Sequence, residues 1–395
     1  MSLNTILGPH GPHGPHGPHG PHGPHGPHSA GGTGTSPLLA AALASTAEGI
    51  SGYWDGSAAT PPTPAGDVPS PSGDWSSFDK LDALPRDAVI HHDLTRLVLS
   101  VPGQNGGAIA KFASVATAEK TEFSPLLTIR PPSLNAFKSQ LTHVRTWGDL
   151  RADRMAEILV QVDDIMPFFA GMTPLHPVAK RWTLGFIDAA RTVSRLVTYP
   201  IKHHFSSPRP HDLAPKVHPP IATPGHGAFP SAHAVESFLI AAILQRLATG
   251  AFPDLTANSG ARALYRVAAR IAQNRTVAGV HYPVDSAAGA LLGVALGQAF
   301  VAHLDGAGTV LPLSLDGTVW CDPASAWHGD FDIDSFCALL SNLVPTVAPN
   351  VAPTAAGTEA SLGGITRGAV PLTIAAPVPN SMLPEIWGKV TAEWA

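Results

Sequence analysis

Apolar residues recur at intervals of three or four from about Leu141 to Leu304. That spacing is typical of helices that bury one face against a core. No run of alternating apolar and polar residues interrupts the region. The pattern therefore predicts an all-α fold, a helical bundle whose principal helices carry these apolar stripes: Leu150–Ile165, Trp182–Val197, Leu239–Leu247, Leu264–Ile271 and Ala287–Leu304.

Proline, serine and glycine predict where the helices begin and end. Pro177 starts the second helix, and Tyr199-Pro200 stops it, because proline lacks the N–H that a helix interior requires. Ser231 begins the third helix and Gly250 ends it. Pro283 opens the last helix.

The pattern weakens outside the bundle. Residues 8–28 are seven copies of Gly-Pro-His, typical of a tag or repeat expansion, and residues 29–79 indicate a disordered linker. Ala108–Lys120 is expected to be a short helix, and the C-terminal part an irregular extension ending in a helix over Met382–Trp394. The predicted organisation is a disordered segment, a helical domain with a motif core at 164–303, and an extension that packs on it, over residues 1–79, 80–304 and 305–395.

Composition limits the partners. Only 13% of the 395 residues are charged and the net charge is −5, so there is no general attraction to nucleic acid or anionic membranes. Two cysteines, Cys321 and Cys337, are too few for a disulfide framework and lack zinc-site spacing. Ala287–Leu304 contains Gln298 and His303, which favours a buried core helix over a membrane span. We expect a soluble protein, in the cytoplasm rather than exported, with oligomerisation left open.

Three short segments gather the chemistry of the chain. In order they read K-x6-R-P, P-S-x-H and R-x5-H-x3-D. Three cations, a hydroxyl, two imidazoles and a carboxylate suit a tetrahedral oxyanion that must be gripped, attacked and protonated. The residues are Lys202, Arg209, Ser231, His233, Arg275, His281 and Asp285.

The first two segments, each taken alone, have plainer interpretations. Lys202 and Arg209 offer a point charge and a planar fork to phosphate oxygens, yet such a pair past a helix end is more often a solvated patch. Ser231 and His233 open a helix whose free N–H groups attract anions. Taken alone, they are more often a plain N-cap serine beside a surface histidine.

The third segment predicts a hydrogen-bonded pair. Pro283 places His281 just before a helix and Asp285 in its first turn. A carboxylate there can accept the Nδ1 proton of His281, which leaves Nε2 free as a nucleophile or a ligand. The alternative is a capping aspartate beside a histidine bonded to backbone. The joint occurrence of the three segments, in order and with complementary roles, favours an anion site.

Together the segments resemble the superfamily that joins type 2 phosphatidic acid phosphatases, bacterial nonspecific acid phosphatases and vanadium-dependent haloperoxidases. The family pattern is K-x6-R-P, P-S-G-H and S-R-x5-H-x3-D, and the similarity covers roughly Asp164 to His303. The resemblance implies a cage for the oxygens of the anion. Its members would be Lys202, Arg209, Arg275, the Ser231 hydroxyl and the Ala232 N–H.

The resemblance also implies the catalytic roles. His281 would attack phosphorus or ligate vanadium, Asp285 would orient it, and His233 would protonate the leaving group or assist peroxide activation. Two positions depart from the family pattern. Ala232 replaces glycine, which keeps the N–H but loses angles open only to glycine, and Asn274 replaces the serine before the arginine.

Three functions follow as alternatives. We expect a soluble phosphatase that hydrolyses small phosphate monoesters through a phosphohistidine and needs no cofactor; Arg275–Gly289 is similar to bacterial phosphatase-type members. The second is a haloperoxidase using peroxide, halide and a vanadate cofactor bound to His281. Its support is His226, five residues before Ser231, as a halide-pocket residue; otherwise His226 is a loop histidine. The third is a non-catalytic binding protein.

Overall fold

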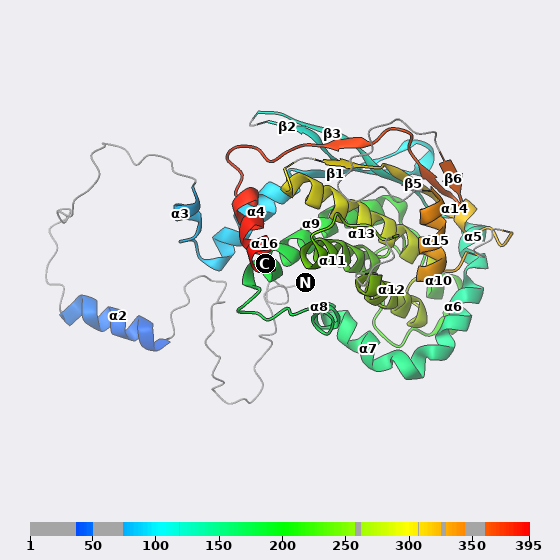
Figure 1. Ribbon diagram of the computed structural model, residues 1–395. Helices are drawn as coiled ribbons and strands as arrows, with labels where there is room; N and C mark the ends of the chain where they lie inside the picture. Colours follow the sequence, from blue (N-terminus) through cyan, green and yellow to red (C-terminus); the bar gives the residue numbers. More distant parts are fainter. Residues whose placement is uncertain are drawn as a thin grey trace. The chain divides into compact units, whose positions relative to one another are not determined.

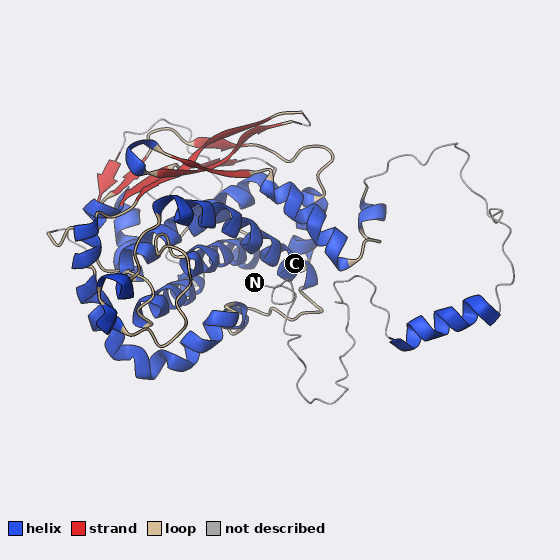
Figure 2. Cartoon of the chain, turned by 180° about the vertical axis from the view of Figure 1, so that it is seen from behind, coloured by secondary structure: helices blue, strands red, loops and turns tan. Residues whose placement is uncertain are grey.

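The helices that carry the three segments pack side by side, and a sheet lies along one face of them (Figures 1 and 2). The computed structural model describes residues 37–49, 74–117, 119–256, 262–306, 308–324, 329–343 and 360–395. The chain divides into two compact units, residues 1–89 and 90–395. The second unit holds every residue singled out for chemistry.

The bounds of the elements follow in chain order. The helices are α2 (Pro37–Gly49), α3 (Trp75–Phe78), α4 (Ala83–Thr95), α5 (Leu134–Ser139), α6 (Leu141–Trp147), α7 (Arg151–Asp163), α8 (Met166–Ala170), α9 (Arg181–Phe205), α10 (Pro210–Leu213), α11 (Ala232–Thr249), α12 (Arg262–Val277), α13 (Pro283–Leu304), α14 (Gly317–Trp320), α15 (Ile333–Leu343) and α16 (Leu383–Ala392). The strands are β1 (Val98–Pro102), β2 (Ala108–Ala116), β3 (Thr121–Arg130), β4 (Gly308–Val310), β5 (Leu313–Asp316), β6 (Ala360–Leu362), β7 (Ile365–Arg367) and β8 (Leu372–Ile374). Short 3₁₀ turns lie at Gln104–Gly106, Gly148–Leu150 and Pro215–Val217.

The prediction of an all-α fold is wrong, because the fold is mixed. Six strands form one sheet in the order β1-β2-β3-β5-β7-β6, and β4 pairs with β8 in a second sheet. Within the large sheet β3 and β5 are parallel and the other pairs antiparallel. The chain that was expected to be an irregular extension therefore supplies half of the large sheet. The predicted domain boundaries stay a prediction.

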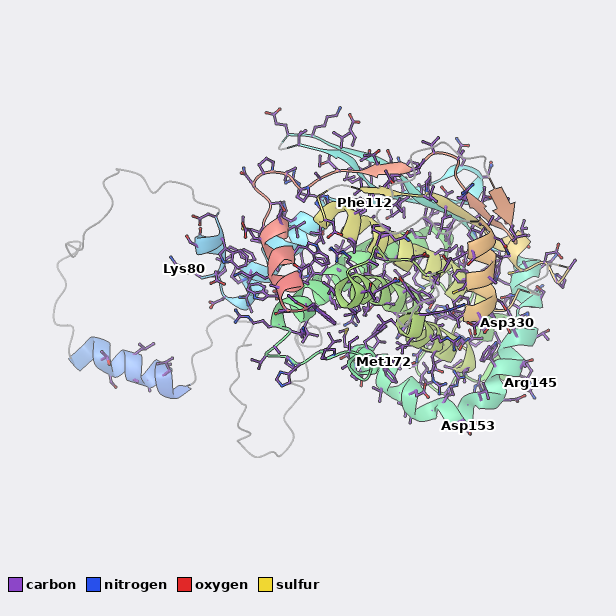
Figure 3. All side chains as sticks on the ribbon, viewed as in Figure 1. Lys80, Phe112, Arg145, Asp153, Met172 and Asp330 are labelled. Atoms are coloured by element: carbon purple, nitrogen blue, oxygen red, sulfur yellow. The ribbon has the colours of Figure 1, made fainter. Side chains whose placement is uncertain are left out.

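Strand β2 occupies the stretch that was predicted to be a short helix. Its pairing with β3 shifts register between Ala110 and Lys111 and again between Ala113 and Val115. Such bulges break the two-residue alternation by which a strand is found in a sequence. Phe112, labelled in Figure 3, packs from this strand onto Phe300 of α13, with ring centroids 5.5 Å apart.

Helix α9 runs through Pro200, where the sequence predicted a stop. Leu196, whose carbonyl would have accepted the missing proline N–H, is 53% exposed, and Pro200 is also exposed. Water can therefore satisfy the free carbonyl. The extra turn places Lys202 inside the helix, where it is buried.

Several predicted boundaries are confirmed. Ser231 is the N-cap of α11, and Gly250 ends this helix in the left-handed conformation, with φ 70°. Helix α13 starts at Pro283, and α16 lies within the stretch predicted for a terminal helix. In the first unit, α2 lies in the stretch that was expected to be disordered. The Gly-Pro-His repeat is outside the described residues.

Helix α7 buries only part of the apolar face predicted for it. Ile158 and Gln161 are buried, whereas Leu159 and Val162 are 53% and 50% exposed. The buried face of α7 packs against the end of α12, where Ile158 forms a small cluster with Val277 and Val280. This contact matters for the site described below.

The closest helix pair is α11 and α13. Three glycines of α13, Gly289, Gly293 and Gly297, face α11, and a Cβ built on Gly289 would lie 2.5 Å from the carbonyl oxygen of Ser231. Their lack of side chains lets the two backbones approach. Within the described residues, α13 is also the one helix long and apolar enough to cross a membrane, with 94% of its most apolar window buried. The absence of a membrane span stays a prediction.

We expect Gly293→Ala to destabilise the protein by about 1–3 kcal/mol, the usual cost of overpacking a tight core. The added methyl would lie 2.9 Å from Phe238 Cβ and 3.0 Å from Leu239 N, and closer still to Val235 O. Urea unfolding measures the change. Gly388→Ala in α16 is the matched control, since nothing lies within 4 Å of its Cβ. Equal stability of the two variants would contradict this account of the α11–α13 contact.

Candidate active site

The ends of four helices bring the predicted residues together. Lys202 lies in the last turn of α9 and Arg275 in the last turn of α12, while Ser231 caps α11 and Asp285 lies in the first turn of α13. Loops between these helices add Arg209, His226 and His281. The three cations are almost completely buried: Lys202 is 0%, Arg209 2% and Arg275 1% exposed.

Main-chain carbonyls fix two of the cations. Lys202 Nζ donates to the carbonyls of Gly227 and Ala228 at 2.9 and 2.7 Å. Gly227 allows this approach, because a Cβ there would lie 2.9 Å from Ser207 N. Arg209 donates from Nε to the His226 carbonyl at 3.1 Å and from Nη1 to the Val280 carbonyl at 2.6 Å.

The third cation, Arg275, is fixed by α7. Its Nη2 donates to Gln161 Oε1 at 3.0 Å and to the Ile158 carbonyl at 3.3 Å. The preceding residue, Asn274, strengthens the same junction, since its Nδ2 donates to Glu157 and Gln161. The departure from serine at position 274 thus gives a buried amide that ties α12 to α7.

The predicted His281–Asp285 hydrogen bond is present. Nδ1 of His281 lies 2.8 Å from Asp285 Oδ2, which also accepts the Tyr282 N–H at 2.9 Å. A carboxylate acceptor places the imidazole proton on Nδ1 and leaves a lone pair on Nε2. The Asp285 carbonyl accepts the Ser231 N–H at 2.9 Å, so the pair is joined to the start of α11.

His233 is held in place through one of its two ring nitrogens, Nε2. Its Nε2 lies 2.9 Å from the Gln161 carbonyl. Because a carbonyl only accepts, Nε2 carries a proton, and Nδ1 remains as the nitrogen that can exchange a proton with a ligand. His233 keeps a partly accessible surface, unlike the cations around it.

The Ser231-Ala232 pair forms an ordinary helix start. Ser231 Oγ accepts the Ala234 N–H at 3.4 Å, and its hydroxyl proton remains available to an anion. Ala232 is the first residue of α11 and is absent from the described non-glycine residues with positive φ, which are Asn105, Ser206 and His218. Alanine therefore replaces the family glycine here without backbone strain.

Burial shifts the pKa values of the whole cluster toward the neutral forms. Burial and repulsion from Arg209 lower the pKa of Lys202 to about 7, and burial lowers that of Arg275 to about 10. Burial, with repulsion from Lys202 and Arg209, holds the pKa of His281 well below its usual value. Burial raises the pKa of Asp285 to about 7. A bound anion would oppose this shift, because its negative charge favours the protonated forms of Lys202, Arg275 and His281.

The pKa of His233 is lowered to about 4, by burial and then by Arg275. His226 lies against the cage, with Nδ1 3.2 Å from Arg209 Nη2 and its ring centroid 5.1 Å from that of Tyr199. Burial and Lys202 lower its pKa as well.

The residues fit a tetrahedral oxyanion such as phosphate or vanadate. Among the buried atoms without a hydrogen-bond partner within the described residues are the donors Ser207 Oγ, Arg275 Nε and Gln161 Nε2 and the acceptor Asp285 Oδ1. Buried donors in this state are costly and are normally satisfied by a ligand or water. No three His, Cys, Asp or Glu side chains in the described part of the chain gather as ligands for a metal cation.

A comparison with protein families agrees with this site. Residues 184–306 match the model of the PAP2 superfamily, which supports the resemblance of this part of the chain to the superfamily of type 2 phosphatidic acid phosphatases and haloperoxidases. Members are generally phosphatase or haloperoxidase enzymes that act on small molecules. A search of curated proteins found no match. The match begins in α9 and so leaves out α7.

Sequence reasoning missed Gln161, which touches two of the predicted site residues. It interpreted α7 only as an apolar stripe. A signal was nevertheless present: Arg154, Glu157 and Gln161 follow each other at helical spacing and contact α12 through Asn274 or Arg270. A polar stripe opposite exposed apolar positions indicates a helix whose partner is itself polar.

We expect the affinity for sulfate to fall as pH rises, because loss of the Lys202 proton and ionisation of Asp285 both remove positive charge from the site. Sulfate keeps its charge over this range, so the change reports on the protein. Isothermal titration calorimetry between pH 5 and pH 9 measures it. Lys202→Met should bind weakly and show a smaller fall, and an unchanged fall in that variant would assign the titration to Asp285 or another group.

Proposed function

We propose that the protein is a soluble phosphatase that hydrolyses small phosphate monoesters through a phosphohistidine at His281. The observation that carries the proposal is the His281–Asp285 hydrogen bond beside three buried cations. The bond directs the Nε2 lone pair of His281 away from the carboxylate. Repulsion from Lys202 and Arg209, together with burial, lowers the pKa of His281 and so favours its neutral, nucleophilic form.

The first step follows from these positions. Lys202, Arg209 and Arg275 bind the non-bridging phosphate oxygens, with the Ser231 hydroxyl and the Ala232 N–H as neutral donors. Nε2 of His281 attacks phosphorus, an N–P bond forms, and the P–O bond to the alcohol breaks. Asp285 stabilises the positive charge on the imidazole. Nδ1 of protonated His233 donates its proton to the departing oxygen.

The second step returns the enzyme to its starting state. Water attacks the phosphohistidine and gives one proton to Nδ1 of His233, the P–N bond breaks, and inorganic phosphate leaves. A pKa of about 4 for His233 favours activity at acidic pH, since the ring must be protonated in the first step. A bound phosphate dianion beside the ring raises this pKa.

The first test is hydrolysis of p-nitrophenyl phosphate. We expect turnover in the wild type that orthovanadate inhibits, and loss of turnover in His281→Ala. Asp285→Asn should reduce kcat on the order of 10³- to 10⁴-fold, because the amide favours the wrong imidazole tautomer. His203→Ala, an exposed histidine next to Lys202, is the control and should keep full activity. Wild-type protein that binds vanadate without any turnover would support a binding protein instead.

One observation favours a vanadium-dependent haloperoxidase as the second candidate. His226 contacts Arg209 and Tyr199 at the border of the cage, where a halide would meet positive charge. The cage that fits phosphate fits vanadate equally, and His281 Nε2 is the atom that would ligate vanadium. When bound, vanadate would supply the centre for peroxide chemistry. The protein would hold the anion, and His233 would exchange a proton.

The second test separates these activities. Vanadate-loaded protein is given bromide and hydrogen peroxide, and bromination of an indicator dye is followed. For a phosphatase we expect no bromination. In a separate assay without vanadate, p-nitrophenyl phosphate turnover should change less than about threefold in His226→Ala, because the main-chain carbonyl of His226 that binds Arg209 is kept. Bromination in the wild type that is lost in His226→Ala would establish the haloperoxidase.

A further inference from the structure

We infer that Gln161 of α7 is a positioning residue of the anion cage and that it acts through Arg275. The inference rests on the proposed function in its assumption that the cage binds a tetrahedral oxyanion. It adds a residue from outside both the motif segments and the stretch that matches the superfamily. It also gives α7 a role in the site.

Gln161 contacts two cage residues from two different helices. Its side-chain Oε1 accepts from Arg275 Nη2 of α12 at 3.0 Å. Its main-chain carbonyl accepts from His233 Nε2 of α11 at 2.9 Å. The residue is 1% exposed, so water does not compete for these bonds. One turn of α7 thus orients both the third cation and the proton donor.

The amide has only one sensible orientation. Two donors, Arg275 Nη2 and Asn274 Nδ2, converge on Oε1 at 3.0 and 3.1 Å. If the amide were flipped, its Nε2 donor would face these two donors. The amide is therefore oriented with Oε1 toward them. This orientation leaves Nε2 without a partner within the described residues. The amide is thus oriented for its oxygen, at the cost of an unpaired nitrogen. This indicates that the site requires Oε1 as the acceptor for Arg275.

Holding Arg275 has a direct consequence for anion binding. The guanidinium is planar, and its edges bind oxygens only when the plane is correctly turned. Gln161 and the Ile158 carbonyl occupy Nη2 and so fix the plane. The side chain of Gln161 can be changed without removing the His233 bond, because that bond is made by the main chain. The two functions of the residue can therefore be separated.

The experiment measures binding of orthovanadate alone by calorimetry. Gln161→Met keeps the volume but loses the acceptor, and we expect roughly 10- to 100-fold weaker binding, as for loss of a hydrogen bond to a charged group. In an Arg275→Met background the same substitution should change affinity less than about twofold, because its partner is gone. A merely structural effect of the substitution would persist in that background and would overturn the inference.

Two further variants complete the experiment: one is a control and the other replaces a variant that does not fold. Glu157→Gln changes a residue one turn away that also contacts Asn274 but touches neither Arg275 nor His233, and it should bind vanadate normally. If Gln161→Met does not fold, Gln161→Leu, which also lacks the acceptor, replaces it and should weaken binding in the same way. A folded Gln161 variant with wild-type affinity overturns the inference.

The wild type separates this inference from the proposed function. Vanadate binding without phosphatase activity contradicts the proposed function and leaves the role of Gln161 standing. No vanadate binding by the wild type contradicts both.

Discussion

Three buried cations within one cluster set the main constraint on this structure. Charged groups removed from water are unstable unless partners surround them, and like charges in proximity add repulsion. Main-chain carbonyls from several loops are the hydrogen-bond partners. Those of Gly227 and Ala228 bind Lys202, and those of His226 and Val280 bind Arg209. These carbonyls carry only partial charge, so they hold the side chains in place without neutralising them. The cluster is therefore suited to an anion.

The helices around the cluster are arranged to meet that constraint. The α11–α13 contact, allowed by the glycines of α13, joins Ser231 to Asp285 through a main-chain hydrogen bond. The hydroxyl of the cage and the carboxylate that orients His281 are therefore parts of one rigid junction. On the opposite side α7 holds Arg275 and His233. The site depends on preorganised donors, which is the usual source of stabilisation for developing charge.

Much of the site could be predicted from the sequence, because its residues lie at fixed spacings on helix ends. The His281–Asp285 bond follows from a helix start at Pro283, and the N-cap at Ser231 from local preference. The carbonyl partners could not be predicted, since main-chain acceptors leave no mark in residue identity. Gln161 was missed because its polar stripe on α7 carries no motif of its own. The sheet was missed for a related reason: β3 pairs with β5, whose residues lie about two hundred positions further along the chain. The bulges in β2 also break the alternation of apolar and polar residues that would have predicted a strand there.

The parallel pairing of β3 with β5 also bears on how the protein is made. Arg130 of β3 forms an ion pair with Asp316 of β5, and the chain between them contains all the helices of the site. On the ribosome, the β1–β3 meander emerges long before its neighbour is synthesised, at about 5–20 residues per second. For that interval the edge of β3 is an open template for another chain. Production of this protein should therefore benefit from chaperones or slow, cool expression, which protect that edge until β5 arrives.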